Sequence, residues 1–176
     1  MRLFGPTPIG VLAGIVFTTI LVLAAIGDFR TRRIPNRLVA TLAVLGLAFS
    51  ATQTPVIAGA LHGFEGLLVG LAVWVPFYAL GWLGAGDVKL FAAAGAWLGP
   101  MRALEGAFIG SMAGAVLAVL WMIRSHGIRG TVQTLGMAAG SPRLLSSTGE
   151  GTKDRSTLPY GVAIAFGAIC AAFIPG

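Results

Sequence analysis

Residues 9–28 read IGVLAGIVFTTILVLAAIGD, and this stretch decides the fold. It carries no charge before Asp28, and its apolar residues follow one another without the alternation typical of a half-buried strand. In a helix, about 20 such residues cross the apolar core of a bilayer. A helix also bonds its own backbone polar groups, as lipid requires. The stretch therefore predicts a membrane-spanning helix that ends at an aspartate.

The rest of the chain is similarly apolar, since 56% of its residues are hydrophobic, 10% are charged and the mean hydropathy is +0.88. Soluble globular domains do not reach such values. We mark six apolar segments, at residues 9–27, 38–51, 60–83, 88–99, 103–123 and 158–174. The predicted fold class is all-α: a polytopic membrane protein with about six transmembrane helices, forming a single membrane-embedded domain over residues 1–176.

Basic residues orient these helices, because cytoplasmic loops carry an excess of Lys and Arg. Most of the 12 basic residues follow the first, third or fifth segment, whereas Arg2 and Arg102 fall on the other side. We therefore expect both termini on the periplasmic side of a bacterial inner membrane. Residues 125–156, rich in Gly, Ser and Thr, are expected to form a cytoplasmic loop. Because no soluble basic face is available, the net charge of +6 does not indicate a nucleic-acid partner.

Two of the six acidic residues stand out by their place in this topology. The first segment runs inward and ends at Asp28, and the fourth runs outward and begins after Asp87, so both carboxylates are predicted at the cytoplasmic edge of the bilayer. Charged groups at that depth are costly unless they are paired or hydrated, which makes them candidates for function. Two structural alternatives stay open: Asp28 pairs with Arg32, or Asp87 caps a helix.

Two carboxylates are enough to hydrolyse a peptide bond without a metal. One, ionised, takes a proton from water, and the other, protonated, polarises the carbonyl and then protonates the leaving amine. Because helix N-termini favour anions and C-termini do not, we expect Asp87 to be the base and Asp28 the acid. Gly84 and Gly86 leave room for a substrate backbone beside Asp87. No cofactor or metal site is expected, and the single cysteine, Cys170, is predicted to be an inert core residue.

Three short motifs lie at the ends of the apolar segments. Residues 28–36 read DFRTRRIPN, residues 84–90 read GAGDVKL and residues 158–163 read LPYGVA. Together they resemble the motifs of the type IV prepilin peptidases, membrane aspartic peptidases of the Gly-x-Gly-Asp type. The resemblance implies that Asp28 and Asp87 are the catalytic pair, and that the substrate is a prepilin or pseudopilin cut at the cytoplasmic face. The further residues that we expect to border the substrate are Gly84, Gly86, Lys89, Pro159 and Tyr160.

The connection after Asp28 departs from larger members of this family. Many bifunctional prepilin peptidases, which also methylate the new N-terminus, carry a cysteine-rich metal-binding insertion here, whereas residues 28–38 contain no cysteine. The chain is similar to the compact peptidases of tight-adherence (Flp/Tad) pilus systems, so methyltransferase activity is not expected. Membrane lipids are the other expected partners, and the oligomeric state is left open.

Two functions of other classes stay open beside the peptidase. One is a small cation or proton transporter that uses membrane-edge carboxylates, and the other is a noncatalytic component of pilus assembly. Transporter sites usually lie near the bilayer midplane, whereas Asp28 and Asp87 are predicted at its edge.

Overall fold

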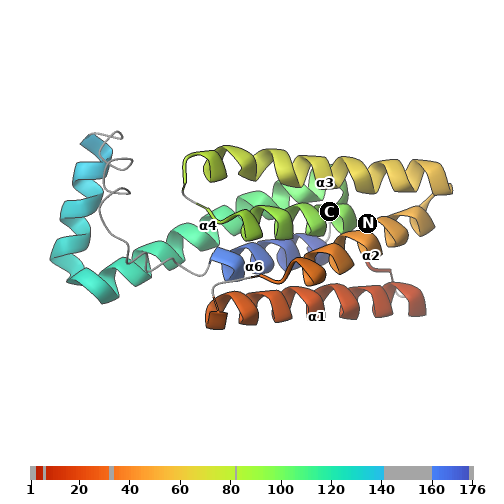
Figure 1. Cartoon of the computed structure of the whole chain (residues 1–176), viewed down its shortest axis with the longest axis horizontal. Coiled ribbons are helices and arrows are strands. Elements are labelled where there is room, and N and C mark those ends of the chain that lie inside the picture. Colours follow the sequence, from red (N-terminus) through yellow and green to blue (C-terminus); the bar gives the residue numbers. More distant parts are fainter. Residues whose placement is uncertain (1–2, 6, 32–33, 82, 141–159, 175–176) are drawn as a thin grey trace. The chain divides into compact units, whose positions relative to one another are not determined.

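The computed structural model describes residues 3–5, 7–31, 34–81, 83–140 and 160–174, with the side chains of 121, 122 and 125–140 left out. Within these ranges the secondary structure is helical throughout, which confirms the all-α prediction (Figure 1). In chain order the helices are α1 (Pro8–Thr31), α2 (Asn36–Gln53), α3 (Val56–Ala79), α4 (Ala85–Gly140) and α6 (Tyr160–Phe173).

The chain divides into two compact units. The larger unit, which we call the bundle, consists of Met1–Ala113 and Pro159–Gly176, and the smaller one is Gly114–Leu158. In the smaller unit α4 remains helical as far as Gly140, so the first part of the loop predicted over residues 125–156 is a helix. Ile128, Val132, Leu135 and Ala139 follow the helical spacing of one apolar face, a pattern that the glycines nearby concealed. The rest of that loop, from residue 141, lies outside the described residues.

Helix α4 turns back on itself inside the bundle. Gly99 has a φ of +73°, and Pro100, which follows it, has no amide to continue the helical hydrogen bonds. A Cβ placed on Gly106 would lie 3.5 Å from Cζ of Phe91, although 15 residues of straight helix would separate the two by about 22 Å. The predicted segments 88–99 and 103–123 are therefore two legs of one continuous helical element.

Glycines allow the helices of the bundle to approach closely. Gly66 of α3 lies against the carbonyl of Gly95 in the first leg of α4, and a Cβ on Gly70 would come within 3.0 Å of the Phe91 carbonyl. On the second leg of α4, Gly106 and Gly110 lie against Gly167 of α6. Small residues at such spacing let helix backbones pack in lipid. These glycines of α3, α4 and α6 therefore allow close packing of the helices.

Three helical segments are long and apolar enough to cross a membrane: α1, α3 and residues Ala85–Leu120 of α4. Helix α6 is apolar but has only 14 residues. Helix α2 carries Arg37 and several hydroxyl and amide side chains, which lower its hydropathy. The structure thus supports a helical protein with three candidate membrane spans. The count of six crossings and the placement of the termini stay predictions.

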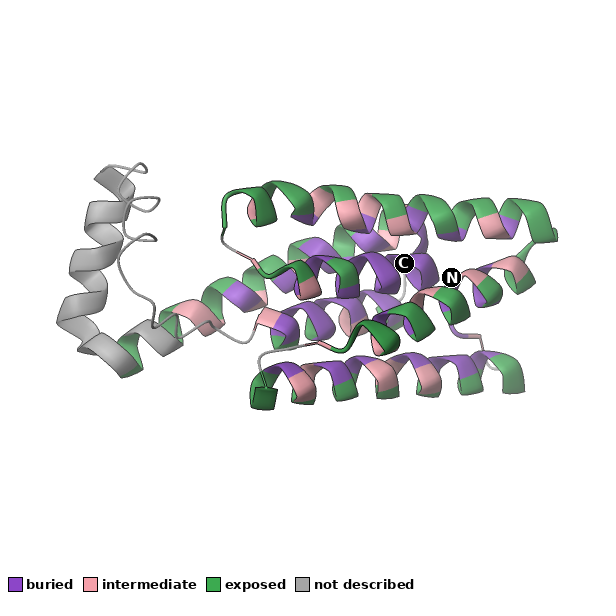
Figure 2. Cartoon of the chain, in the orientation of Figure 1, coloured by how far each residue is buried: buried purple, intermediate pink, exposed green. Residues whose placement is uncertain are grey.

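The surface of the bundle is unusually apolar. Figure 2 shows buried residues along the inward faces of its helices and exposed residues along the outward faces. Many exposed side chains are large and hydrophobic, among them Ile9 at 69%, Ile57 at 77% and Phe108 at 68%. A contiguous exposed apolar surface of this extent is unfavourable in water. It fits a bundle whose outward faces contact lipid.

Candidate active site

Asp28 lies in the last turn of α1, where the apolar run ends. Its side chain is 8% exposed. The carboxylate oxygen Oδ2 accepts a hydrogen bond from the backbone N–H of Gly161, at 3.0 Å, in the first turn of α6. The two residues are 133 positions apart. The packing of α1 against α6 therefore places a backbone donor on this carboxylate.

Asp87 lies in the first turn of α4 and is 9% exposed. Its Oδ2 accepts a hydrogen bond from the backbone N–H of Gly84, just before the helix, at 3.3 Å. An acidic side chain that reaches back in this way caps the start of a helix, so the capping alternative for Asp87 is confirmed. Oδ1 of Asp87, in contrast, is buried and has no hydrogen-bond partner in the described part of the chain. Capping alone does not account for a buried, unpaired carboxylate oxygen.

The structure brings the two aspartates together. Asp28 and Asp87 lie close enough for their charges to interact. The Tyr160 hydroxyl, at the start of α6, also interacts electrostatically with Asp87. The end of α1 and the starts of α4 and α6 thus meet at one end of the bundle. Two adjacent carboxylates that repel each other readily share one proton.

Only some of the other predicted site residues lie beside this pair of aspartates. Gly84 donates its amide to Asp87, and Tyr160 is half-buried beside it. Gly86 faces Ile34 instead, since a Cβ on Gly86 would lie 3.5 Å from Cβ of Ile34. Lys89 is exposed. Pro159 lies outside the described residues, as does Arg32, the alternative partner of Asp28.

Gly161 is the site residue that the sequence reasoning missed. It was visible as the third residue of the Pro-Tyr-Gly sequence at the start of a predicted helix, where backbone amides have no partner within the helix. Its contact with Asp28 changes the expected division of roles. Both carboxylates now accept an amide at or beside the start of a helix, so the helix-dipole argument no longer separates a base, Asp87, from an acid, Asp28.

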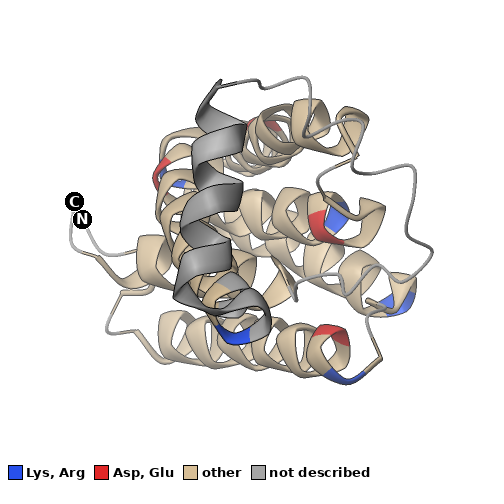
Figure 3. Ribbon diagram, turned by 90° about the vertical axis from the view of Figure 1, so that its left-hand side faces the viewer, with Lys and Arg blue, Asp and Glu red and all other residues tan. Residues whose placement is uncertain are grey.

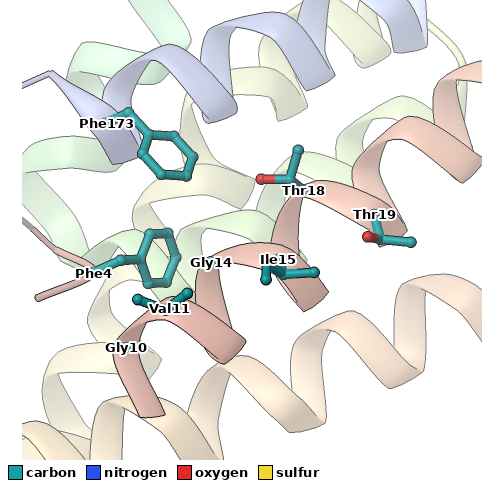
Figure 4. Close-up of a pocket in the computed structure, with 8 residues that line it drawn as sticks. All are labelled: Phe4, Gly10, Val11, Gly14, Ile15, Thr18, Thr19 and Phe173. Atoms are coloured by element: carbon teal, nitrogen blue, oxygen red, sulfur yellow. The ribbon is translucent and has the colours of Figure 1, made fainter. Parts of the chain in front are cut away.

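Acidic and basic residues are sparse along the described helices (Figure 3). An apolar cavity of about 560 Å³ runs along α1 and α6, with Phe29, Arg30 and Val162 among its lining residues. A second cavity, of about 410 Å³, lies toward the other end of α1, where the rings of Phe4 and Phe173 form part of its lining (Figure 4). Within the described ranges, no group of three or more His, Cys, Asp or Glu side chains is placed to hold a metal ion.

Comparison with known proteins gives a family for this site. The profile of the type IV leader peptidase family matches residues 15–119, a range that holds both aspartates and more than half of the chain. The chain belongs to the type IV leader peptidase family. Tyr160 and Gly161 lie beyond the matched range, so their place beside the aspartates is known from the structure alone.

Curated relatives in this family are longer proteins. The prepilin leader peptidase/N-methyltransferase of Pectobacterium carotovorum subsp. carotovorum is 35% identical over 114 residues, covering 61% of this chain and 40% of that protein. The proteins of the same name from Escherichia coli (strain K12) and Neisseria gonorrhoeae are 42% and 30% identical, with 39% and 41% of their lengths covered. The chain thus spans about two fifths of these relatives. No solved structure matches it.

Proposed function

We propose that this chain is an aspartic endopeptidase of the inner membrane that removes the leader peptide of a prepilin or pseudopilin. The observation that carries the proposal is the pair of buried, interacting carboxylates of Asp28 and Asp87 in a member of the type IV leader peptidase family. Relatives bear the name prepilin leader peptidase/N-methyltransferase. We propose peptidase activity alone, because residues 28–38 lack the cysteine-rich insertion of many bifunctional enzymes.

In the proposed reaction, one aspartate is ionised and the other holds the shared proton. The ionised carboxylate takes a proton from a water molecule while the water oxygen attacks the carbonyl carbon of the scissile bond. The protonated carboxyl donates a hydrogen bond to the carbonyl oxygen and stabilises the tetrahedral intermediate. When the C–N bond breaks, this proton passes to the leaving amine. The products are the free leader peptide and a mature protein with a new N-terminus.

The proposed topology has six crossings. Helices α1, α2, α3 and α6 each supply one, and the two legs of α4, joined at Gly99 and Pro100, supply two. The excess of basic residues after the first, third and fifth segments supports periplasmic termini and cleavage at the cytoplasmic face. The short connection after Asp28 favours a Flp/Tad-type prepilin as the substrate.

Co-expression with a candidate prepilin tests the proposal. Asp28→Asn and Asp87→Asn remove the carboxylates at nearly constant size, and we expect each to lower the rate of leader removal by about a thousandfold or more. Glu105→Gln is the matched control, because it makes the same acid-to-amide change at an exposed position of α4. The rate is read as the ratio of precursor to mature protein on a gel. Normal processing by either Asp→Asn variant would overturn the assignment.

A further inference from the structure

The contact between Asp28 and Gly161 is closer than a side chain at position 161 would allow. The Gly161 N–H donates to Oδ2 of Asp28 at 3.0 Å in a buried setting. A Cβ on Gly161 would lie 2.7 Å from that same oxygen and 3.0 Å from both Cβ and Cγ of Asp28. Contacts this short force one partner to move. Glycine is therefore the residue that lets α6 bring its amide onto the carboxylate.

We infer that Gly161 is a positioning residue, which fixes the carboxylate of Asp28 beside Asp87 through its amide and its lack of a side chain. The importance of this placement for catalysis rests on the proposed peptidase function. The contact itself does not depend on that function.

The backbone amide that Asp28 accepts comes from another helix, as its place in its own helix requires. The last turn of a helix presents unpaired carbonyls, which repel a carboxylate, and offers no free amides. The start of α6 has the opposite polarity, so its first amides complement Asp28. Asp87 differs, since its donor, Gly84, lies three residues away in its own helix start. The amide donor of Asp87 is thus local, whereas the Gly161 amide reaches Asp28 only through the docking of α6.

The docking of α6 is itself well supported. Gly167 lies against Gly106 and Gly110 of the second leg of α4. At the far end of α6, Nη1 of Arg102 donates to the carbonyl of Ala171 at 2.9 Å. These contacts hold α6 along its length, so the Gly161 amide is presented from a rigid element. A rigid donor can hold a carboxylate within the narrow tolerance that catalysis requires.

The first test measures the contact without any substrate. Gly161→Ala, Asp28→Gly and the double variant form a double-mutant cycle, read as thermal unfolding of the purified full-length protein in detergent. Alanine is the better helix former, yet we expect Gly161→Ala to lower the melting temperature by roughly 2 to 10 °C through overpacking. In the Asp28→Gly background most of this loss should disappear, because Oδ2, Cγ and Cβ of residue 28 are all gone.

The cycle also decides the case in which Gly161→Ala fails to fold. Recovery of folding in the double variant supports the contact. An equal loss in both backgrounds, or no folding in either, overturns it, because the cost of the alanine would then come from another neighbour.

The second test uses cleavage kinetics on a prepilin. We expect Gly161→Ala to lower kcat by about a hundredfold, the cost of a misplaced catalytic group, with KM changed by no more than about twofold. Gly110→Ala is the matched control: it makes the same substitution facing α6, but its Cβ would lie 3.4 Å from the carbonyl of Ala163, an ordinary contact. Both variants should bind the substrate, and only the first should cut it slowly.

The outcomes separate this inference from the proposed function. A parent protein that cleaves no prepilin counts against the peptidase, while the double-mutant cycle still decides the Gly161 contact. A parent that cleaves, with Gly161→Ala equal to it in kcat, overturns the positioning role and leaves the peptidase standing. A rise in KM alone also overturns it, since it would place Gly161 in substrate binding.

Discussion

The two ends of the bundle differ in how completely their buried polar groups are hydrogen-bonded. At the end where α1 finishes and α4 and α6 begin, Asp28 and Asp87 are buried next to each other, and Oδ1 of Asp87 has no partner among the described residues. Toward the other end, Nε1 of Trp97 donates to the Leu42 carbonyl and Oγ of Ser50 donates to the Ala96 carbonyl, both at 2.8 Å.

Aromatic packing also stabilises the end of the bundle that contains Trp97. The Trp97 ring stacks on Phe49 with a centroid distance of 5.3 Å, and it also contacts the rings of Phe4 and Phe17. We call this region, with Ser50 and Arg102, the tryptophan end, and the region around Asp28 and Asp87 the aspartate end. Buried polar groups are ordinarily satisfied, and exceptions concentrate at functional sites. The contrast indicates a scaffold at one end and a site that lowers stability at the other.

The largest expected effect is at the aspartate end. Asp87→Asn should lower the rate of leader removal by about a thousandfold while the melting temperature stays the same or rises, because a buried charge beside Asp28 is removed. Thermal unfolding and gel-based cleavage on one preparation measure both quantities. If the melting temperature instead falls with the activity, the aspartate end is structural and the contrast between the two ends breaks down.

The tryptophan end should respond in the opposite way. Trp97→Ala removes the centre of the aromatic cluster and the donor to Leu42, and we expect a loss of roughly 3 to 5 kcal/mol in the free energy of unfolding. The kcat of the protein that remains folded should change little, because the aspartates keep their amide donors. The measurement is the cleavage rate divided by the fraction of protein that is folded. A kcat that falls with stability would show that the two ends are coupled.

The sequence predicted well what depends on local pattern. Residues 9–28 predicted a membrane helix ending at an aspartate, and α1 ends three residues after Asp28. The break around Pro100 separated two apolar segments, and the chain turns back there. Alternation of inward and outward segments was enough to predict that Asp28 and Asp87 lie at one end. These features follow from composition, charge and helix length alone.

Contacts between distant helices were beyond that reasoning. The Gly161 amide reaches Asp28 across 133 residues, and the Trp97 indole reaches Leu42 across 55. In a sequence, a glycine indicates close packing or flexibility. Only the structure shows which side chain lies in the space that its absent Cβ leaves. The helix from residue 125 to Gly140 was missed for another reason, since the glycines in this stretch concealed the helical spacing of its apolar residues.

A smaller effect is expected where the tryptophan end holds α6. Arg102 donates from Nη1 to the carbonyls of Ala171 and Ile174, at 2.9 and 3.3 Å. Arg102→Met keeps most of the side-chain volume but removes these charge-assisted bonds, and we expect a loss of about 1.5 kcal/mol in stability. Because α6 carries the Gly161 amide at its other end, kcat should fall by less than about tenfold. A larger fall in kcat at unchanged stability would place Arg102 in the active site.

The smallest effect expected concerns Ser50 and the turn in α4. In a continuous helix the Ala96 carbonyl would accept the amide of residue 100, but residue 100 is a proline and has none. Oγ of Ser50 supplies the missing donor from α2. Ser50→Ala therefore leaves a buried carbonyl unpaired, which costs about 1 kcal/mol or slightly more.

Ser111→Ala is the control for this last variant. Its Oγ also donates to a backbone carbonyl, that of Ala107 at 2.7 Å, but this carbonyl lies four residues back in the same helix and Ser111 is exposed. Back-bonding of this kind contributes little to helix stability, so the change in unfolding free energy should stay within about 0.5 kcal/mol. If both serine variants lose the same stability, the Ser50 hydroxyl does not compensate for Pro100, and the turn of α4 is held by Gly99 and the aromatic cluster alone.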